Sequence, residues 1–236
     1  MQLSKLEYIT YETLRKNNLS VFRIKDISLL INTGRTRAYN IIKSLKKKGA
    51  IETVRPGLYA LKGTHEFVIG ASLNWPSYLS FWSALNYYGL TDQMPKIIFF
   101  ASTKYMKPVK NFRYVVLNTK RFFGYGTIGD MVIAEKEKAV IDSLLLPRYI
   151  SSMRELYSGI ESHLHELDID KIIHYALRIN SKAVIRRLGF ILDECKIRKK
   201  QLELLSKNKG KGYELLDPTI NKKNNFNKKW LLDINW

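Results

Sequence analysis

A basic amphipathic segment near the N-terminus constrains the fold of this chain more than any other stretch of its sequence. Within residues 35–48, apolar side chains from Ala38 to Leu45 recur at helical spacing and form a single stripe. Gly49 follows, and glycine readily takes the left-handed conformation that ends many helices. The segment therefore predicts one surface helix with an apolar face and a basic face.

The pattern changes immediately after this helix. Residues 50–54 and 58–62 are short strand candidates, and the sequence Arg-Pro-Gly occupies 55–57 between them. Proline and glycine at the two central positions are what a type II turn requires. The segment predicts a tight hairpin that carries an arginine at its tip.

Two further helical patterns precede the basic helix. They cover residues 4–17 and 23–32, and a short polar break at 32–34 separates the second from the third. Helix, helix, turn, basic helix and hairpin is the order of a winged helix-turn-helix, whose third helix enters the major groove of DNA. We expect residues 1–62 to form such a DNA-binding domain.

The chemistry of the basic segment suggests a role for each side chain. Arg35 and Arg37 can donate paired hydrogen bonds to guanine, and Asn40 can do so to adenine. The remaining polar side chains suit phosphate or minor-groove contacts. An ordinary solvated helix face is the alternative that the sequence leaves open. The predicted DNA-binding residues are Arg35, Thr36, Arg37, Tyr39, Asn40, Lys43, Lys47 and Arg55.

The distribution of charge supports an anionic partner. The net charge over 236 residues is +19. Residues 1–62 hold 13 Lys or Arg against 4 Asp or Glu, residues 63–194 hold 16 against 13, and residues 195–236 hold 11 against 4. The two ends are therefore strongly basic and the middle is nearly balanced. With a single cysteine, no apolar run long enough to cross a bilayer and no secretory leader pattern, we expect a cytoplasmic protein without membrane attachment.

The middle of the chain, residues 63–195, predicts an α+β domain. A buried helix is expected first, then a small sheet, then several amphipathic helices. Residues 196–236 form a separate basic extension, rich in Lys and Asn, which we expect to be partly disordered, although its aromatic residues favour packing against the rest. The predicted helices are 77–90, 135–148, 168–180 and 181–195, and the predicted strands lie within 95–102, 112–117 and 121–134.

No pattern in this middle region amounts to an enzyme signature. The glycines of 124–129 match G-x-G-x-x-G but precede a strand rather than a helix, so a hairpin is the better interpretation. His163 and His165 are two residues apart, which does not place both on one helix face for a metal. The acidic residues of 135–142 alternate with lysines, as on a solvated helix face. We expect no catalytic residue, metal or cofactor.

Several sequence segments, taken together, resemble the AbiEi antitoxin family of abortive-infection systems. They are "KSLKKKGAIETVRPGLYAL", "PSYLSFWSALNYYGLTDQMP", "AEKEKAVIDSLL" and "IRRLGFILDE", in that order along residues 43–194. The family-like positions in the middle domain are Gly89, Thr91, Glu137, Lys138 and Asp142. Gly89 suits a helix end, Thr91 and Asp142 suit the pairing of backbone groups, and Glu137 with Lys138 suits either a folding pair or part of an antitoxin surface.

The resemblance implies a winged helix followed by an antitoxin domain. It implies repression of the protein's own operon through inverted repeats in promoter DNA, bound by a monomer or a dimer. It also implies that the chain counters a nucleotidyltransferase-like toxin, for which a stable complex is not required. A stand-alone transcription regulator with a ligand-sensing middle domain is the alternative, because the Tyr- and Phe-rich middle region also suits a small-molecule pocket.

Overall fold

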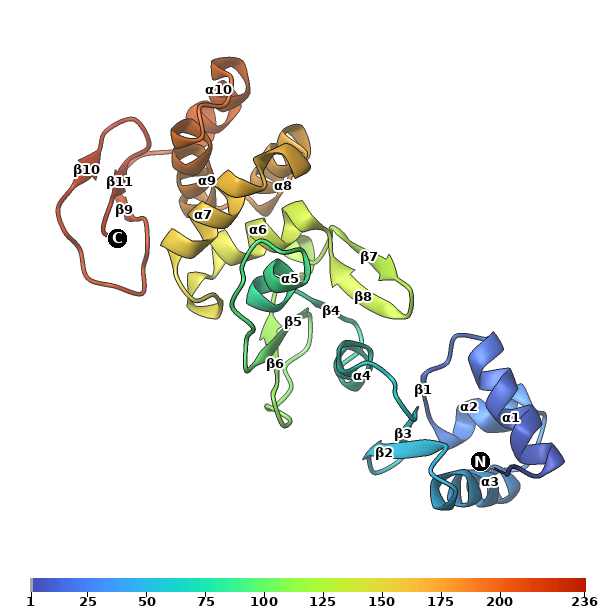
Figure 1. Ribbon diagram of the computed structural model, residues 1–236. Coiled ribbons are helices and arrows are strands. Elements are labelled where there is room, and N and C mark those ends of the chain that lie inside the picture. Colours follow the sequence, from blue (N-terminus) through green and yellow to red (C-terminus); the bar gives the residue numbers. More distant parts are fainter. Residues whose placement is uncertain (1) are drawn as a thin grey trace. The chain divides into compact units, whose positions relative to one another are not determined.

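The structure of the chain is a computed structural model that describes residues 2–236 (Figure 1). It combines helices with three separate sheets, which confirms the expected α+β class. The chain divides into two compact units. The first contains Met1–Trp75 and Thr127–Met131, and the second contains Pro76–Gly126 and Val132–Trp236.

The first unit contains helices around a small antiparallel sheet of order β1-β3-β2. Its elements are α1 (Lys5–Lys16), β1 (Val21–Phe22), α2 (Ile24–Leu30), α3 (Arg35–Lys47), β2 (Ile51–Arg55), β3 (Leu58–Leu61) and α4 (Glu66–Leu73). The predicted boundary after residue 62 lies inside this unit, because α4 contacts β1 and continues the unit to Trp75.

The core of the first unit is built from the apolar faces of its three N-terminal helices. The stripe predicted on α3 is buried throughout, and Ala38 and Leu45 are fully covered. Gly49 and Gly57 both have positive φ, 69° and 78°, so the predicted helix end and hairpin turn each rest on a glycine. The local sequence signals therefore place these elements correctly.

Glu7 fastens α1 to α3. Its carboxylate closes the capping box with Ser4 and accepts hydrogen bonds from the Ser44 hydroxyl and, at 2.5 Å, from the Lys48 ammonium. The Lys48 ammonium and the Ser44 hydroxyl lower the pKa of Glu7 from 4.5 to about 2. Ionised Glu7 therefore stabilises the first unit.

Glu7→Gln is expected to destabilise the chain by about 1–2 kcal/mol at neutral pH, because the ionised group is lost. A carboxyl whose pKa is lowered on folding stabilises the protein above its ordinary pKa, and this contribution disappears as the pH falls. The difference between wild type and variant should shrink between pH 4.5 and about 2. Denaturant unfolding at several pH values measures it. Glu12→Gln, which affects only a more exposed ion pair with Arg15, is the control and should change stability by less than about 0.5 kcal/mol.

The second unit begins with a five-stranded sheet, continues with helices and ends in a small sheet. Its five-stranded sheet has the order β6-β5-β4-β8-β7, with β5 parallel to β6 and β4 parallel to β8. The strands are β4 (Ser77–Leu79), β5 (Ile98–Ser102), β6 (Phe112–Val116), β7 (Tyr125–Ile128) and β8 (Met131–Ala134), of which residues 127–131 are counted with the first unit. The strands predicted within 95–102, 112–117 and 121–134 are thus confirmed.

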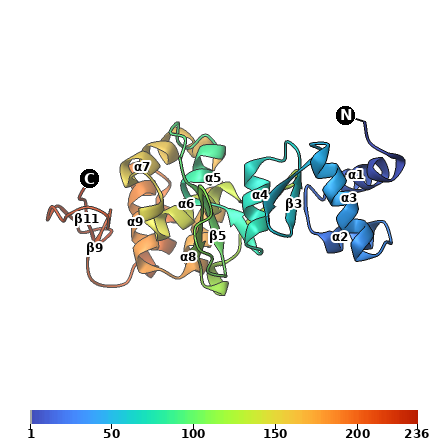
Figure 2. The same ribbon diagram turned by 90° about the horizontal axis from the view of Figure 1, so that it is seen from below.

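The helices of this unit pack mainly on one another. Figures 1 and 2 show α6, α8 and α9 side by side, and each contacts the other two. The helices are α5 (Phe81–Tyr87), α6 (Lys136–Leu145), α7 (Met153–Ser162), α8 (Ile169–Ile179), α9 (Lys182–Glu194) and α10 (Lys199–Asn208), with 3₁₀ turns at Thr119–Arg121, Pro147–Tyr149 and Leu164–Glu166.

One predicted helix is wrong in part. Residues 77–90 begin as strand β4, and only Phe81–Tyr87 are helical. Ser80 has an extended backbone and Phe81 a positive φ of 53°, which separates the two elements. A continuous apolar run does not distinguish a buried strand from a buried helix, since periodicity is uninformative when both faces are covered.

The C-terminal extension is ordered around a buried tryptophan, contrary to the expectation of partial disorder. It forms α10 and a three-stranded sheet of β9 (Glu214–Leu215), β10 (Phe226–Asn227) and β11 (Leu232–Asp233). Trp230 is fully buried, lies against Gly189 of α9 and donates a hydrogen bond to Asp193 at 2.9 Å. The expectation that aromatic residues pack this segment back is confirmed for Trp230 and Trp236, whereas Tyr213 and Phe226 stay half exposed.

Gly189→Ala is expected to loosen this attachment. An alanine Cβ would lie 2.1 Å from the Trp230 ring, so the indole must leave its place. We expect a loss of about 1–3 kcal/mol and a red-shifted tryptophan emission. Gly126→Ala, at a glycine with open space around it, is the matched control. An unchanged emission spectrum in Gly189→Ala would show that Trp230 does not dock there.

Candidate functional site

The exposed surface of α3 is the most basic feature of the first unit. All eight predicted DNA-binding residues, including Arg55 at the hairpin, are exposed to solvent. Tyr39, the largest apolar member of this set, has 49% of its surface accessible. Because the opposite face of α3 is buried in the core, the seven of these side chains that belong to α3 point to solvent.

The cations of this surface have no ionic partner within residues 2–236. Arg35, Arg37, Lys43 and Lys47 make no ion pair there, and α3 itself contains no acidic residue. Only Lys48, next to α3, is paired, and its partner is Glu7. The exposed surface of α3 therefore presents uncompensated positive charge, which attracts polyanions.

A hollow of about 510 Å³ extends this surface. Its lining residues come from the start of α2, the start of α3 and the hairpin turn. Arg23 and Lys25 line it together with Arg35 and Gly57, and both are exposed. These two cations are not among the residues predicted from the sequence, although their place at the start of the helix that precedes the basic helix is a usable signal. The hollow brings three cations together beside the hairpin.

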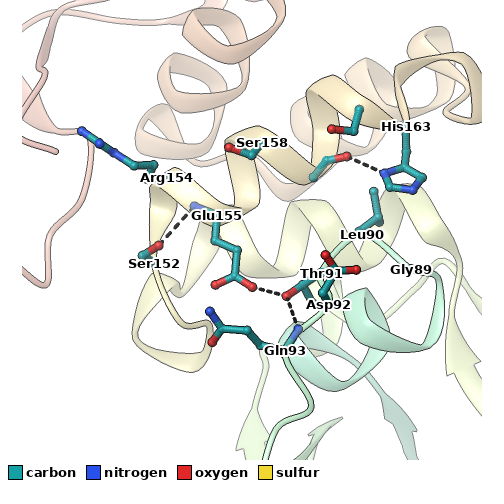
Figure 3. Close-up of a pocket in the computed structure, with 12 residues that line it drawn as sticks. Gly89, Leu90, Thr91, Asp92, Gln93, Ser152, Arg154, Glu155, Ser158 and His163 are labelled. Atoms are coloured by element: carbon teal, nitrogen blue, oxygen red, sulfur yellow. Dashed lines mark hydrogen bonds between the residues drawn. The ribbon is translucent and has the colours of Figure 1, made fainter.

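The family-like positions of the second unit fall into two separate places. Gly89 and Thr91 line a surface pocket of about 460 Å³ beside α7 (Figure 3). Gly89 has a φ of 74° directly after α5, which confirms its expected role at a helix end. Glu137, Lys138 and Asp142 are absent from the pocket lining and belong to α6.

The pocket wall is polar and closely packed. The carboxylate of Glu155 accepts hydrogen bonds from the hydroxyls of Thr91 and Ser151, and the Thr91 oxygen also accepts from the Gln93 amide. Gly159 of α7 lies so close to the Leu90 carbonyl that a Cβ would be 2.0 Å from its oxygen. The helix α7, for which the sequence gives no clear pattern, therefore fixes the loop that carries Thr91.

Lys138 and Asp142 form a fully buried ion pair, which overturns the expectation of a solvated face. Both side chains have no accessible surface. Asp142 also accepts hydrogen bonds from Ser80 at 2.8 Å and Tyr78 at 3.0 Å, and Lys138 donates to the Tyr78 hydroxyl at 2.9 Å. The partners of Asp142 are side chains and not the backbone groups expected for it.

Burial changes the protonation chemistry of this cluster. It lowers the pKa of Lys138, although the Asp142 carboxylate opposes this, and it raises the pKa of Tyr78 well above its ordinary value. The ammonium also lies 4.9 Å from the Phe123 ring centroid, in cation–π contact. A lysine covered on every side is available neither to a partner protein nor to a substrate, so the cluster holds the fold together.

Glu137 does not form the pair with Lys138 that one interpretation of the sequence predicted. It accepts a hydrogen bond from the Asp168 amide at 3.2 Å and pairs with Lys171, which also approaches Glu135. Both carboxylates therefore join α6 to α8. Their positions make them structural residues at a helix junction.

The other residues considered as possible sites in the sequence are the glycine motif, the two histidines and Cys195. The glycines of 124–129 lie in and around the β7–β8 hairpin, as predicted. His163 contacts the Gly159 carbonyl through Nδ1, whereas His165 is exposed near Glu166. Within the described part of the chain, no three His, Cys, Asp or Glu side chains gather as metal ligands. Burial raises the pKa of Cys195 to about 11, which makes its thiol a poor nucleophile at neutral pH.

Comparison with known proteins supports the fold and leaves the function open. No protein-family model and no curated protein matches the chain. The chain is similar to a solved structure described as the RV2827C protein from Mycobacterium tuberculosis, with a TM-score of 0.67 and 12% sequence identity over 98% of this chain and 92% of that one. Across residues 2–236, no helix has the length and apolar character needed to cross a bilayer. At this identity, the likeness establishes a shared fold alone.

Proposed function

We propose that this chain is a DNA-binding antitoxin and transcriptional autorepressor of an AbiE-type operon. The exposed, unpaired basic surface of α3 is the observation that carries the DNA-binding part. In this proposal α1, α2, α3 and the β2–β3 hairpin are a winged helix-turn-helix, with α3 as the helix that enters the major groove. Double-stranded DNA upstream of the protein's own gene is the expected ligand.

The side chains of α3 divide between bases and phosphates. Arg35, Arg37 and Asn40 occupy the N-terminal half, which contacts base edges in helix-turn-helix proteins. Lys43 and Lys47 follow one and two turns later and suit the phosphate backbone. Tyr39 and Thr36 offer hydroxyl groups for the same purpose. In this proposal Arg55, which is exposed at the hairpin, contacts the backbone or the minor groove.

The hollow at the start of α2 supports a phosphate contact. Arg23, Lys25 and Arg35 line it together, and phosphate oxygens accept hydrogen bonds from guanidinium and ammonium groups. Arg23 and Lys25 therefore join the proposed backbone contacts, while Arg35 serves the hollow or the bases.

Salt dependence tests the phosphate contacts. Lys25→Gln should lower the affinity for any duplex sequence and reduce the slope of log affinity against log salt by about 0.9. Fluorescence anisotropy with a labelled duplex at several salt concentrations measures the slope. Lys16→Gln, an exposed lysine of α1 in the same unit, is the control. Equal slopes for Lys25→Gln and wild type would show that the hollow does not contact DNA phosphates.

The antitoxin part of the proposal rests on the family-like motifs. Glu155 holds the loop around Thr91. Thr91 itself is buried, so Gly89, Asp92 and Gln93 beside it are the exposed part of these motifs. The test is growth of cells that express a neighbouring nucleotidyltransferase-like gene with or without the full chain. Rescue supports the antitoxin function, and a toxic neighbour that the chain does not counter would contradict it while leaving DNA binding intact.

A ligand-responsive regulator is the second candidate, and the pocket beside α7 favours it. Its volume of about 460 Å³ and its serine, carboxylate and arginine side chains suit a small polar ligand. In that case a metabolite, rather than a neighbouring toxin, would change the affinity for DNA. A shift of the DNA-binding curve by a small molecule, lost in Ser158→Trp, would favour this function.

A further inference from the structure

The small C-terminal sheet is a rigid platform and not a loose tail. Trp230 and the Asp193 interaction anchor it to α9, and Arg186 and Arg187 of the same helix donate hydrogen bonds to backbone carbonyls of residues 209–215. Asn235 closes the surrounding loop by hydrogen bonds to Asp217. The backbone that carries the exposed side chains of this platform is therefore held in place.

Two aromatic rings remain half exposed on the platform and contact each other. Tyr213 lies beside β9 and Phe226 begins β10, and these strands flank the middle strand β11. The ring centroids are 4.9 Å apart at 65°, and the residues are 47% and 50% accessible. A rigid pair of exposed rings on a sheet offers flat apolar faces to planar groups.

The chain segment that carries the two rings is strongly basic. Residues 195–236 contain 11 Lys or Arg against 4 Asp or Glu. Two of those acids, Asp217 and Asp233, are buried on backbone amides, and Glu214 approaches Arg186. By contrast, Lys211, Lys222 and Lys228 are exposed and make no ion pair within the described chain. The platform therefore attracts an anion with planar groups.

Single-stranded nucleic acid combines these two properties. Its unpaired bases stack on aromatic side chains, while its phosphates are neutralised by lysines. A duplex hides its base faces, and a membrane surface presents no planar rings. The exposed amides of Asn221, Asn224 and Asn225 add donors and acceptors suited to base edges and to the ribose 2′-hydroxyl.

We propose that the C-terminal platform binds single-stranded RNA, with Tyr213 and Phe226 stacking on two bases and Lys211, Lys222 and Lys228 contacting the backbone. This site lies in a different unit from α3 and does not depend on the duplex-binding proposal. It gives the basic extension a ligand of its own.

The test is fluorescence anisotropy of the full chain with a labelled oligouridine of about twelve nucleotides, close to the length that such sites cover. Tyr213→Ala with Phe226→Ala should weaken binding about tenfold or more, whereas Tyr213→Phe with Phe226→Tyr, which keeps both rings, should bind like wild type. Tyr87→Ala is the matched control. Tyr87 is a 42% exposed tyrosine that packs edge-to-face on Tyr88 in a segment, 83–91, without Lys or Arg.

Three further arms complete the experiment. Lys228→Gln should reduce the salt slope by about 0.7, as expected for a single strand. Arg35→Ala with Arg37→Ala should leave oligouridine binding unchanged, which separates this site from α3. The proposal is overturned if wild type does not bind oligouridine at low salt, if the alanine pair binds as tightly as wild type, or if oligothymidine binds more tightly than oligouridine.

Discussion

Asp142→Ala is expected to destabilise the second unit by about 3–5 kcal/mol. The substitution leaves the Lys138 ammonium fully buried without its counter-ion, and it leaves the hydroxyls of Tyr78 and Ser80 without their acceptor. Removing one partner of a buried pair costs far more than the pair itself contributes, because the remaining charge stays desolvated. A loss of this size is a large fraction of the stability of an ordinary domain.

Denaturant unfolding of a matched set measures this effect. Ser143→Ala, the next residue of α6, removes a buried hydroxyl that bonds only to the Ala139 carbonyl and should cost about 1 kcal/mol. Lys138→Met with Asp142→Leu removes both charges and should recover much of the loss. If Asp142→Ala were no worse than Ser143→Ala, the buried pair would not be the main polar contact of this core.

Arg35→Ala with Arg37→Ala is expected to weaken binding to the DNA upstream of the gene at least about thirtyfold. Each arginine that bonds a guanine contributes about 1–3 kcal/mol of discrimination. The loss should be larger for the upstream sequence than for a shuffled duplex, because base contacts carry the preference and phosphate contacts do not. Anisotropy titrations with both duplexes separate the two contributions.

Arg15→Ala with Lys16→Ala provides the control. These two residues are exposed in the last turn of α1, so the substitution removes the same charge from the same unit. It should change both affinities by only a few-fold, through the general field of the protein. An equal loss in both variants would mean that net charge, and not the exposed surface of α3, determines binding.

The sequence predicts the first unit well because its signals are local. The stripe on α3, the glycine that ends the helix and the Pro-Gly turn each depend on residues within a few positions of one another. Their physical causes, helical periodicity and permitted backbone angles, are complete within the segment. The exposure of the seven predicted residues on α3 follows from the same periodicity.

Two features of the second unit depend on residues far apart in the sequence, so local sequence patterns do not predict them. Lys138 and Asp142 are four residues apart, the spacing of a common surface ion pair, yet they are buried because α5, α8 and α9 all pack on α6. Likewise, the Lys- and Asn-rich extension suggests disorder until Trp230 meets Gly189, some forty residues earlier in the chain. Non-local packing decides both cases.

Photo-crosslinking from single positions of the first unit tests the central claim most directly. Tyr39 on α3 and Tyr8 on α1 are both exposed, at 49% and 58%, and each can be replaced by the photoreactive analogue p-benzoylphenylalanine. With the upstream duplex bound, we expect a crosslink from position 39 and none above background from position 8. A crosslink from position 8 alone, with the duplex equally bound, would contradict the assignment of α3 as the helix that enters the groove.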